Sequence, residues 1–370
     1  AIGIILAGGN NNRMKELTAK RAVPALPVAG SFRSIDFALS SMSNSHIQTV
    51  AVLTQYNARS LNEHLSSSKW WNFGRKQGGL FLFTPTVTAD NSDWYRGTAD
   101  AMYQNIDFLK RRHEPYVIIS SGDCVYKLDF NRVLDFHIEK KSDITVVCKD
   151  MMYNDDVSRF GVVRMDDESR ITEFDEKPIE ALSNTISTGI YVIRRRQLIE
   201  LLEAAAEENR FDFVNDILVR YKNVKKIYGY KINSYWNNIA DIDAYFKTNM
   251  DFLRPDVRSY FFREEPTICS KVDDLPPAKF NPGSDISNSL VSSGCIINGS
   301  VEDSVLFKQV FVGKNTTVKN CVILNDVYIG DNVHLENCIV ESRGTINPNT
   351  CYCGEDGVMI VKEKNVRYVI

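Results

Sequence analysis

The chain has 370 residues, of which 44% are hydrophobic and 25% charged, and its formal net charge is −3. These values are ordinary for a globular chain and give no bias toward nucleic acid or an anionic membrane, so we expect neither as a partner. No apolar run in the sequence approaches the roughly 18 residues that a spanning helix needs. The first residues lack the basic flank of a signal peptide, and the eight cysteines follow no secreted-type framework. We therefore expect a chain long enough for two domains, located in the reducing cytoplasm.

The first 250 residues alternate short β-branched runs with helical patterns. The apolar runs predict strands buried on both faces at residues 2–7, 50–55, 116–120 and 144–148. Helical patterns lie between these runs, for example at residues 36–44 and 99–112. This alternation predicts an α/β domain with a mostly parallel sheet and helices on both faces. In such sheets, ligands bind beyond the carboxyl ends of the strands.

Residues 251–285 differ in composition from what precedes them. Five prolines in this segment interrupt regular structure: Pro255, Pro266, Pro276, Pro277 and Pro282. We interpret the segment as a connector that packs over the first domain. Residues 286–370 then form a second domain.

That second domain contains a repeat with a period of 17 residues. The two sets of equivalent positions are Val312, Ile329, Ile346 and Val318, Leu335, Tyr352. A short repeat rich in Val and Ile, with Gly or Asn at its corners, predicts a parallel β-helix. Roughly four coils fit between residues 286 and 355, with Val312, Val318, Ile329 and Leu335 facing inward. Because the end of such a stack commonly packs against another surface, we also expect an oligomer.

Cys321 and Cys338 occupy equivalent positions of this repeat, and Cys351 and Cys353 follow in its last part. Metal binding by Cys321, Cys338, Cys351 and Cys353 is one interpretation. We favour a ladder of small core residues instead, because cysteine packs well as a small hydrophobe. The five histidines show no ligand spacing. His334 is the one histidine on the coils that an acyltransferase could use, and we discount that function.

The segment LAGGNNNRM, which follows the first predicted strand, has the features of a phosphate-binding loop. It begins with Leu6, Ala7, Gly8 and Gly9. The glycine pair permits a tight turn whose backbone N–H groups can face a phosphate, and Arg13 adds a forked donor. Asn11 can adopt the left-handed conformation that glycine would otherwise supply. Many α/β proteins carry a glycine turn here, so the loop alone is a weak signal.

Four further motifs follow. SSGDCVYK places Asp123 at a strand end, where a carboxylate can hold Mg²⁺ on a nucleotide phosphate, although a cap or turn aspartate is the competing interpretation. In EFDEKP, Lys177 is either a sugar-phosphate ligand or a solvated hairpin lysine. DWYRGTADA is a tight turn into a helix that could flank a base or ribose, and STGIYVI is a strand with small polar residues at its start.

Together and in this order, the motifs resemble those of the ADP-glucose pyrophosphorylase (glucose-1-phosphate adenylyltransferase) family. The resemblance covers essentially the whole chain and includes RSIDFALS, LTQY, WYRGTADA, SGDCVYK, FDEKP, GIYV and LPPAKF. WYRGTADA and LPPAKF favour this family over other sugar nucleotidyltransferases. The implied fold is a Rossmann-like nucleotidyltransferase domain over residues 1–250 and a left-handed parallel β-helix over residues 286–370. The implied reaction joins ATP and glucose 1-phosphate into ADP-glucose and pyrophosphate with Mg²⁺, for glycogen or starch synthesis, usually in an allosterically regulated tetramer.

The resemblance also assigns roles to matching positions. Arg13 matches a triphosphate contact, Asp123 a metal ligand and Lys177 a sugar-phosphate contact. The other implied substrate-binding residues are Glu176, Ser187, Gly189 and Tyr191. The implied nucleotide-binding residues are Leu6, Ala7, Gly8, Gly9, Gly97, Thr98 and Ala99. Lys20 and Arg21 fall where regulatory phosphates bind in some members.

Three departures from the family pattern converge on the transferring phosphate. The loop reads GGNNNRM where the family has GGxGTRL, so Asn11 replaces a glycine. The chain has RAVPAL where the family has RAKPAV, so Val23 replaces a lysine near the reacting phosphates. The chain has YWNNIAD where the family has WRDVGT, so Asn238 replaces the second metal-binding aspartate and Asn237 replaces an arginine.

Losing one pre-organised charged donor typically costs on the order of 10²–10³ in rate, so we expect poor catalysis. The pattern resembles the regulatory subunit that accompanies a catalytic subunit in some bacterial glycogen operons. It implies a hetero- or homotetramer with that homologue, binding of ATP and of glucose 1-phosphate or ADP-glucose, and sugar-phosphate effectors. The alternative is an active adenylyltransferase, in which Asp241 replaces the lost metal ligand and Lys15 or Lys20 the lost lysine.

Overall fold

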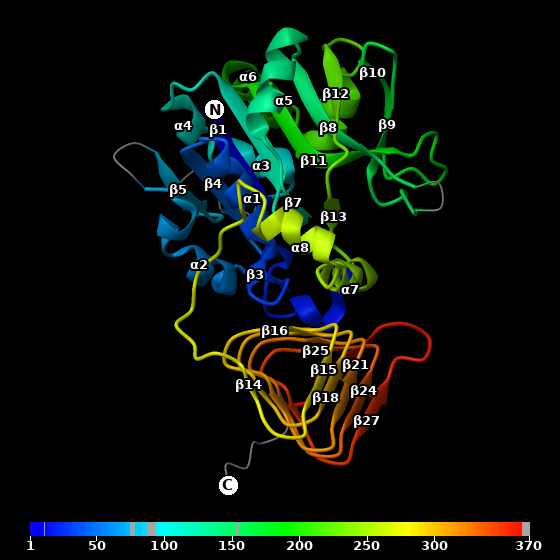
Figure 1. The fold of residues 1–370 in the computed structure, drawn as a ribbon. Coiled ribbons are helices and arrows are strands. Elements are labelled where there is room, and N and C mark those ends of the chain that lie inside the picture. Colours follow the sequence, from blue (N-terminus) through cyan, green and yellow to red (C-terminus); the bar gives the residue numbers. More distant parts are fainter. Residues whose placement is uncertain (11, 75–77, 87–93, 153–154, 365–370) are drawn as a thin grey trace.

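The computed structural model describes residues 1–10, 12–74, 78–86, 94–152 and 155–364. Figure 1 shows a Rossmann-like α/β domain joined to a stack of strands in three sheets, a left-handed β-helix, which confirms the predicted fold class. The stack, coloured yellow to red, lies against one end of the α/β domain, and α7 (Ile242–Asp251) lies at the junction (Figure 1). Within the parts of the chain that the structure describes, no helix combines the length and apolar content that a membrane span needs.

One large sheet forms the centre of the α/β domain. Its strands are β1 (Ile2–Ala7), β4 (Thr49–Thr54), β5 (Gly79–Phe83), β6 (Tyr116–Ser121), β8 (Ile144–Asp150), β9 (Gly161–Met165), β10 (Ile171–Glu176), β11 (Thr185–Arg194) and β12 (Ile227–Lys231). The four strands predicted from apolar runs are confirmed as β1, β4, β6 and β8. Small pairs of strands complete the domain: β2 (Pro27–Val28) with β3 (Phe32–Arg33), and β7 (Cys124–Tyr126) with β13 (Trp236–Asn238).

The prediction of a mostly parallel sheet is wrong for half of the strand pairs. Strands β5, β4, β1 and β6 are parallel neighbours, and β12 is parallel to β8. However, β11 runs antiparallel to β6, β8 and β9, and β9 and β10 form an antiparallel pair. Antiparallel neighbours need only a short connection, so the helix-bearing crossover that the alternation predicts is not required there.

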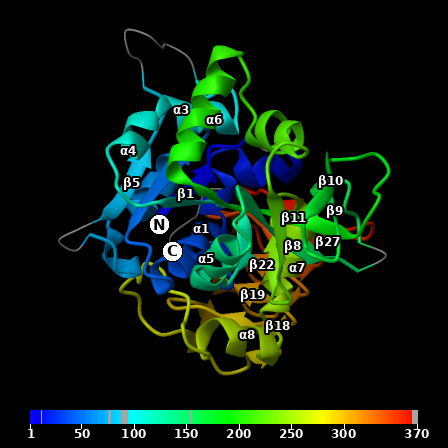
Figure 2. The same cartoon turned by 90° about the horizontal axis from the view of Figure 1, so that it is seen from above.

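Helices cover both faces of the sheet, as predicted. They are α1 (Ser34–Asn44), α2 (Arg59–Leu65), α3 (Thr98–Gln104), α4 (Ile106–Lys110), α5 (Phe130–Glu139), α6 (Arg195–Glu207), the 3₁₀ helices η1 (Asn12–Thr18), η2 (Val23–Ala25) and η3 (Ser68–Trp71), and the π-helical η4 (Val214–Val219). Ile5 of β1 packs in one apolar core with α1 and α5, whereas Ile4 packs in a second core with α3 and α6. Figure 2 shows α3 and α6 on one side of the sheet and α5 on the other.

Two expectations about helices need correction. Residues 99–112 form α3 and α4 rather than one helix, with Asn105 between them. The Asn105 side chain donates to the Ala101 carbonyl at 2.8 Å, a local bond that competes with continued helix. In the connector, Pro255 begins α8 (Pro255–Phe262) instead of interrupting structure, because the first helical position needs no backbone N–H donor.

Three sheets of parallel strands make the β-helix. The first contains β14 (Lys279–Phe280), β17 (Ile296–Ile297), β20 (Phe311–Val312), β23 (Tyr328–Ile329) and β26 (Thr345–Ile346). The second contains β15 (Asp285–Ser287), β18 (Ser300–Glu302), β21 (Thr317–Lys319), β24 (His334–Glu336) and β27 (Cys351–Cys353). The third contains β16 (Leu290–Val291), β19 (Val305–Leu306), β22 (Val322–Ile323), β25 (Cys338–Val340) and β28 (Met359–Val361).

The strand register explains the sequence repeat. Val318 pairs with Leu335 one coil later, and Val312 pairs with Ile329, as the 17-residue period predicts. All four of these side chains are fully buried, which confirms that they face inward. Each sheet has five strands where the repeat indicated roughly four coils. The sequence repeat did not reveal the first coil, because Asp285 pairs with Ser300 at a spacing shorter than the 17-residue period.

The cysteine ladder is confirmed for two of its four members. Cys321 and Cys338 are fully buried inside the coils. The ladder is wrong for Cys351, which is exposed, and for Cys353, which is partly exposed. These two residues flank the inward position 352 on β27, so alternation along the strand turns them outward.

A shared apolar cluster joins the two domains. Phe252 and Phe261, which lie in and around α7 and α8, pack with Val305, Val322 and Ile339 of the β-helix. The chain after α8 returns over the α/β domain, where the Trp71 indole N–H donates to the Cys269 carbonyl at 3.2 Å. The segment expected as a connector therefore contributes to packing on both sides.

Candidate functional site

The opening lined by the predicted motifs lies beyond the carboxyl ends of β1, β4 and β6. It is a cavity of about 650 Å³, in the place where open α/β sheets bind ligands. The predicted site residues that line it are Leu6, Ala7, Gly8, Gly9, Arg13, Val23, Gly97, Thr98, Asp123, Lys177 and Asn238. Parallel pairing of β1 with β4 and β6 brings the first of these segments to one edge.

Other predicted residues are not part of the cavity wall. Those are Ala99, Glu176, Ser187, Gly189, Tyr191, Lys20 and Arg21. Ser187 and Tyr191 are buried in β11, where the Ser187 hydroxyl donates to the Tyr191 oxygen at 3.3 Å. Gly189 has a positive φ of 74° and lies within the register shift of that strand. Asn11 lies outside the described residues.

The strand end and the loop after it approach neighbouring backbone closely. The Gly122 N–H donates to the Leu6 carbonyl at 3.0 Å, and a Cβ on Gly8 would lie 3.2 Å from the Gln55 Cβ. Glycine at position 8 therefore lets the loop pass the end of β4. Arg13 is exposed on η1 and lines the cavity.

Asp123 and Asn238 lie at neighbouring positions of a short strand pair. Strand β13 runs antiparallel to β7, with Asn238 opposite Cys124, and the Ile239 N–H donates to the Asp123 carbonyl at 2.9 Å. The Ser121 hydroxyl donates to Oδ1 of Asp123. The chain thus brings together the two positions that the resemblance assigns to metal binding.

The amide of Asn238 is held in place by its own hydrogen bonds. Its Oδ1 accepts from the Ala240 N–H at 3.0 Å, and its Nδ2 donates to the Cys124 sulfur at 3.4 Å. Burial and the charge of Asp123 keep the pKa of the Cys124 thiol well above its usual value, so this sulfur stays neutral. Among the described residues of the wall, Asp123 is the one carboxylate.

The side chains that could bind Mg²⁺ at this site supply only the minimum number of carboxylates that the ion usually has. This ion is usually held by one or two carboxylates together with substrate phosphates. Asp123 supplies one carboxylate, and the amide oxygen of Asn238 supplies no charge. These donors fit Mg²⁺ only if the phosphates of a nucleotide supply further ligands.

The cavity wall is apolar at position 23, where the family pattern has a lysine. Val23 begins η2 and is only 4% exposed, packed in a cluster with Met14, Leu17 and Leu26. Asn237 turns away from the wall, since its Nδ2 donates to the Tyr235 hydroxyl at 2.9 Å. Neither position offers a cation to a bound phosphate.

Asp241, the suggested replacement metal ligand, is already engaged. Its Oδ1 caps α7 by accepting from the Ala244 N–H at 2.8 Å, and its Oδ2 forms an ion pair with Arg159. Arg159 lines the cavity and is a site residue that sequence reasoning missed. The ion pair offsets the charges of both partners. Lys15 and Lys20 are exposed and lie outside the wall.

The sugar-phosphate motif lies at the rim of the cavity. Lys177 follows β10 and is 60% exposed, and its Nζ lies 3.1 Å from Oε1 of Glu176. The Lys177 backbone N–H donates to the Phe160 carbonyl at 3.0 Å, which fixes the start of the side chain. The lysine is therefore solvated, as the simpler interpretation predicts, and also faces the cavity.

The opposite rim contains two further residues that sequence reasoning left unassigned within LTQY. The Gln55 side chain bonds both backbone groups of Tyr95, accepting from its N–H at 2.7 Å and donating to its carbonyl at 3.3 Å. The Tyr56 ring stacks on Trp94, with centroids 5.7 Å apart. Their position after β4 was the available signal, because parallel strands bring their carboxyl ends to one edge.

Arg21 lies at the junction of the domains. Its Nη1 donates to the Ser342 hydroxyl at 3.3 Å, and its Nη2 lies 4.0 Å from the Glu341 carboxylate. These contacts join the loop after η1 to the β-helix.

Comparison with known proteins agrees with this geometry. A family model described as nucleotidyl transferase matches residues 2–254, and one described as GlmU-like C-terminal hexapeptide matches residues 276–360. The fold is that of a nucleotidyl transferase. Similar relatives, each named glucose-1-phosphate adenylyltransferase, come from Geobacillus stearothermophilus (39% identical, covering 97% of this chain and 94% of the relative) and Clostridium novyi (38%, covering 86% and 84%). The chain belongs to the glucose-1-phosphate adenylyltransferase family.

We predict that Gly97→Ala destabilises the α/β domain by about 1–3 kcal/mol, the usual cost of overpacking. An added Cβ would lie 2.3 Å from the Phe211 carbonyl oxygen, which accepts from the backbone N–H of Ala99 at 2.8 Å. Urea denaturation measures the loss. Gly9→Ala is the matched control, since no atom lies within 4 Å of its added Cβ, and it should change stability by less than about 0.5 kcal/mol. Equal stability of the two variants would contradict the close approach.

Proposed function

We propose that this chain is a modulatory subunit of glucose-1-phosphate adenylyltransferase in glycogen synthesis, with impaired catalysis of its own. The relatives' names supply the reaction class. The observation that carries the proposal is the charge of the cavity wall, where Asp123 is the one carboxylate among the described residues and Val23 is a buried apolar side chain.

The reaction needs the metal-binding carboxylates and a phosphate-binding cation at one place. A phosphate oxygen of glucose 1-phosphate attacks the α-phosphorus of ATP, and pyrophosphate leaves with the remaining negative charge. Such transfers depend on positioning and on neutralising charge, with little covalent help from protein. A bound Mg²⁺ would supply charge neutralisation between the phosphates. In this chain Asp123 would help to hold that ion, Asn238 would add no charge, and Val23 would contribute no cation.

The residues expected to bind the substrates are retained more fully than the charged residues expected at the transferring phosphate. The glycine pair 8–9, Arg13, Gly97 and Thr98 line the cavity, as does Lys177. This arrangement supports binding of ATP and of glucose 1-phosphate or ADP-glucose. The proposed ligand sets are Leu6, Ala7, Gly8, Gly9, Arg13, Gly97 and Thr98 for nucleotide and Lys177 with Glu176 for the sugar phosphate.

The competing function is an active adenylyltransferase. It requires a second carboxylate and a cation from elsewhere in the chain. The ion pair between Asp241 and Arg159 opposes this, because each partner already offsets the other's charge. The proposed partner is therefore a catalytic homologue, in a heterotetramer that responds to sugar-phosphate effectors, with Lys20 and Arg21 as candidate effector contacts near the domain junction.

We predict that Lys177→Ala weakens binding of glucose 1-phosphate or ADP-glucose by about 1–3 kcal/mol, the cost of losing a charged contact. Titration calorimetry measures the affinity. Lys226→Ala is the control, because Lys226 is exposed and precedes β12, at the sheet edge opposite the cavity. Unchanged affinity in Lys177→Ala would reject this contact.

We predict that Val23→Lys with Asn238→Asp raises ADP-glucose formation by the isolated chain on the order of 10²-fold or more. The gain should exceed that of either single change, because both groups act on one transition state. Coupled detection of pyrophosphate measures the rate. Val23→Met with Asn238→Gln is the matched control, since it changes size without adding charge. A double variant no faster than this control would oppose the charge argument.

We predict that mixing the unmodified chain with a catalytic homologue produces a mixed oligomer and changes the homologue's rate or its effector response. Size-exclusion chromatography with light scattering reports assembly, and ADP-glucose formation reports the rate. An equal mass of unrelated protein is the control. Separate elution together with an unchanged effector response would reject the modulatory role without bearing on the catalytic defect.

A further inference from the structure

Four side chains of types that bind metal ions lie on the outer face of the β-helix, distant in sequence from the nucleotide motifs. His334 and Glu336 are the outward positions of β24, since Leu335 between them is buried. Cys351 and Cys353 are the outward positions of β27. The register pairs His334 with Cys351 and Glu336 with Cys353. The four side chains therefore form a two-by-two square on adjacent coils.

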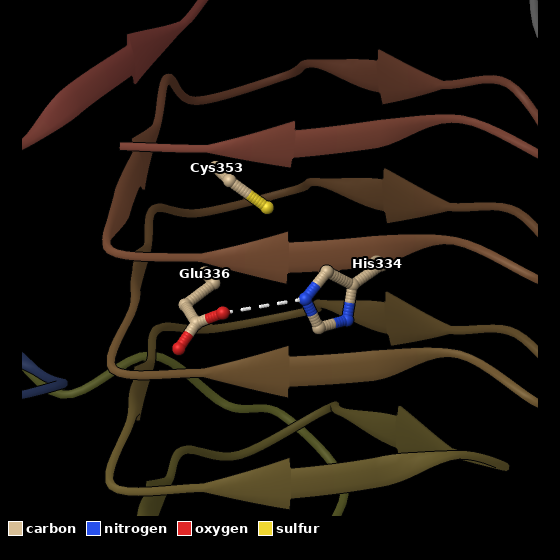
Figure 3. A group of neighbouring side chains, drawn as sticks. All are labelled: His334, Glu336 and Cys353. Atoms are coloured by element: carbon tan, nitrogen blue, oxygen red, sulfur yellow. Dashed lines mark ion pairs between the residues drawn. The ribbon is translucent and has the colours of Figure 1, made fainter. Parts of the chain in front are cut away.

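The three nearest ligand atoms already converge. His334 Nε2 lies 3.4 Å from Glu336 Oε2, and the ligand atoms of His334, Glu336 and Cys353 all lie within 4.8 Å of one another. Figure 3 shows the imidazole and the carboxylate facing each other on one strand, with the Cys353 sulfur directed toward the space between them from the next coil. The Cys351 and Cys353 sulfurs are 3.6 Å apart.

These distances match the edges of a tetrahedral zinc site. Bonds of about 2.1 Å to nitrogen and oxygen put two such ligands about 3.4 Å apart, and bonds of about 2.3 Å put two sulfurs about 3.8 Å apart. The observed separations are 3.4 Å for the nitrogen and oxygen and 3.6 Å for the two sulfurs. The Cys353 sulfur lies within 4.8 Å of the His334 and Glu336 ligand atoms, so these separations need to shorten by about 1 Å, which side-chain torsions can supply.

The chemistry of the donors selects the ion. Thiolate and imidazole ligands favour zinc over Mg²⁺ or Ca²⁺, which prefer oxygen. The nearest lysine in register, Lys319, pairs with Glu302 at 3.6 Å.

We propose that the outer face of the β-helix binds one zinc-type divalent cation through His334, Glu336 and Cys353, with Cys351 as the fourth ligand. The ion joins β24 to β27 and so fastens the last coil to the one before it. This site is separate from the nucleotide cavity and independent of catalysis. Side chains of His334 and Glu336 are 43% and 46% exposed, so an ion can enter from solvent.

The test is titration calorimetry of the full chain with Zn²⁺, after chelator treatment and under reducing conditions. The proposal expects one ion per chain with a dissociation constant on the order of 10⁻⁷ M or tighter, the weak end of structural zinc sites. His334→Ala with Cys353→Ser should weaken binding at least 100-fold, and Cys351→Ser about tenfold. His113→Ala with Cys269→Ser is the matched control, since both residues are exposed elsewhere, and should leave binding unchanged.

Co²⁺ provides a second readout that reports the ligands directly. The proposal expects a thiolate-to-cobalt charge-transfer band that Cys353→Ser abolishes and Cys269→Ser preserves. Glu336→Gln keeps the side-chain shape and should weaken Zn²⁺ binding, so the test stands even where the double variant folds poorly. Absence of one-to-one Zn²⁺ binding, or affinity equal in the double variant and its control, would overturn the site and identify an ordinary His–Glu ion pair.

Discussion

The antiparallel pairing of β7 with β13 is the constraint on which the site depends. Residues 123 and 238 are more than a hundred positions apart in sequence, and this pairing sets Asn238 opposite Cys124, next to Asp123. Under the proposed function, a metal-bound phosphate at the carboxyl end of β6 would lie beside both side chains, which line one cavity. An asparagine at this point therefore changes the charge of the site itself, whatever the surrounding loops do. The neutral Cys124 thiol beside it adds no compensation.

The other departures from the family pattern act on the same space in different ways. Val23 belongs both to the cavity wall and to the apolar cluster that joins the domains, so its side chain is part of the packing as well as of the site. In the Arg159–Asp241 ion pair, each partner offsets the charge of the other. Under the proposed function, the cavity binds nucleotide and sugar phosphate but has too little charge at the point of transfer.

The sequence predicted best what depends on local periodicity. β1 and the inward positions Val318 and Leu335 were found because apolar runs and a fixed repeat are visible in one dimension. Glycine and carboxylate positions at strand ends likewise led to the cavity. Reversal of β11 was missed, because a buried strand has the same composition in either direction. Arg159 was missed because its place on the wall comes from tertiary packing, with no motif around it.

Turnover of the purified, unmodified chain tests the central claim most directly. With ATP, glucose 1-phosphate and Mg²⁺ at saturating concentrations, a missing carboxylate and a missing cation predict ADP-glucose formation at least about 10²–10³ below that of an ordinary enzyme. A rate of roughly 1–10³ s⁻¹ from this chain alone, the range of ordinary enzymes, would contradict the account and show that the cavity has all the charge it needs.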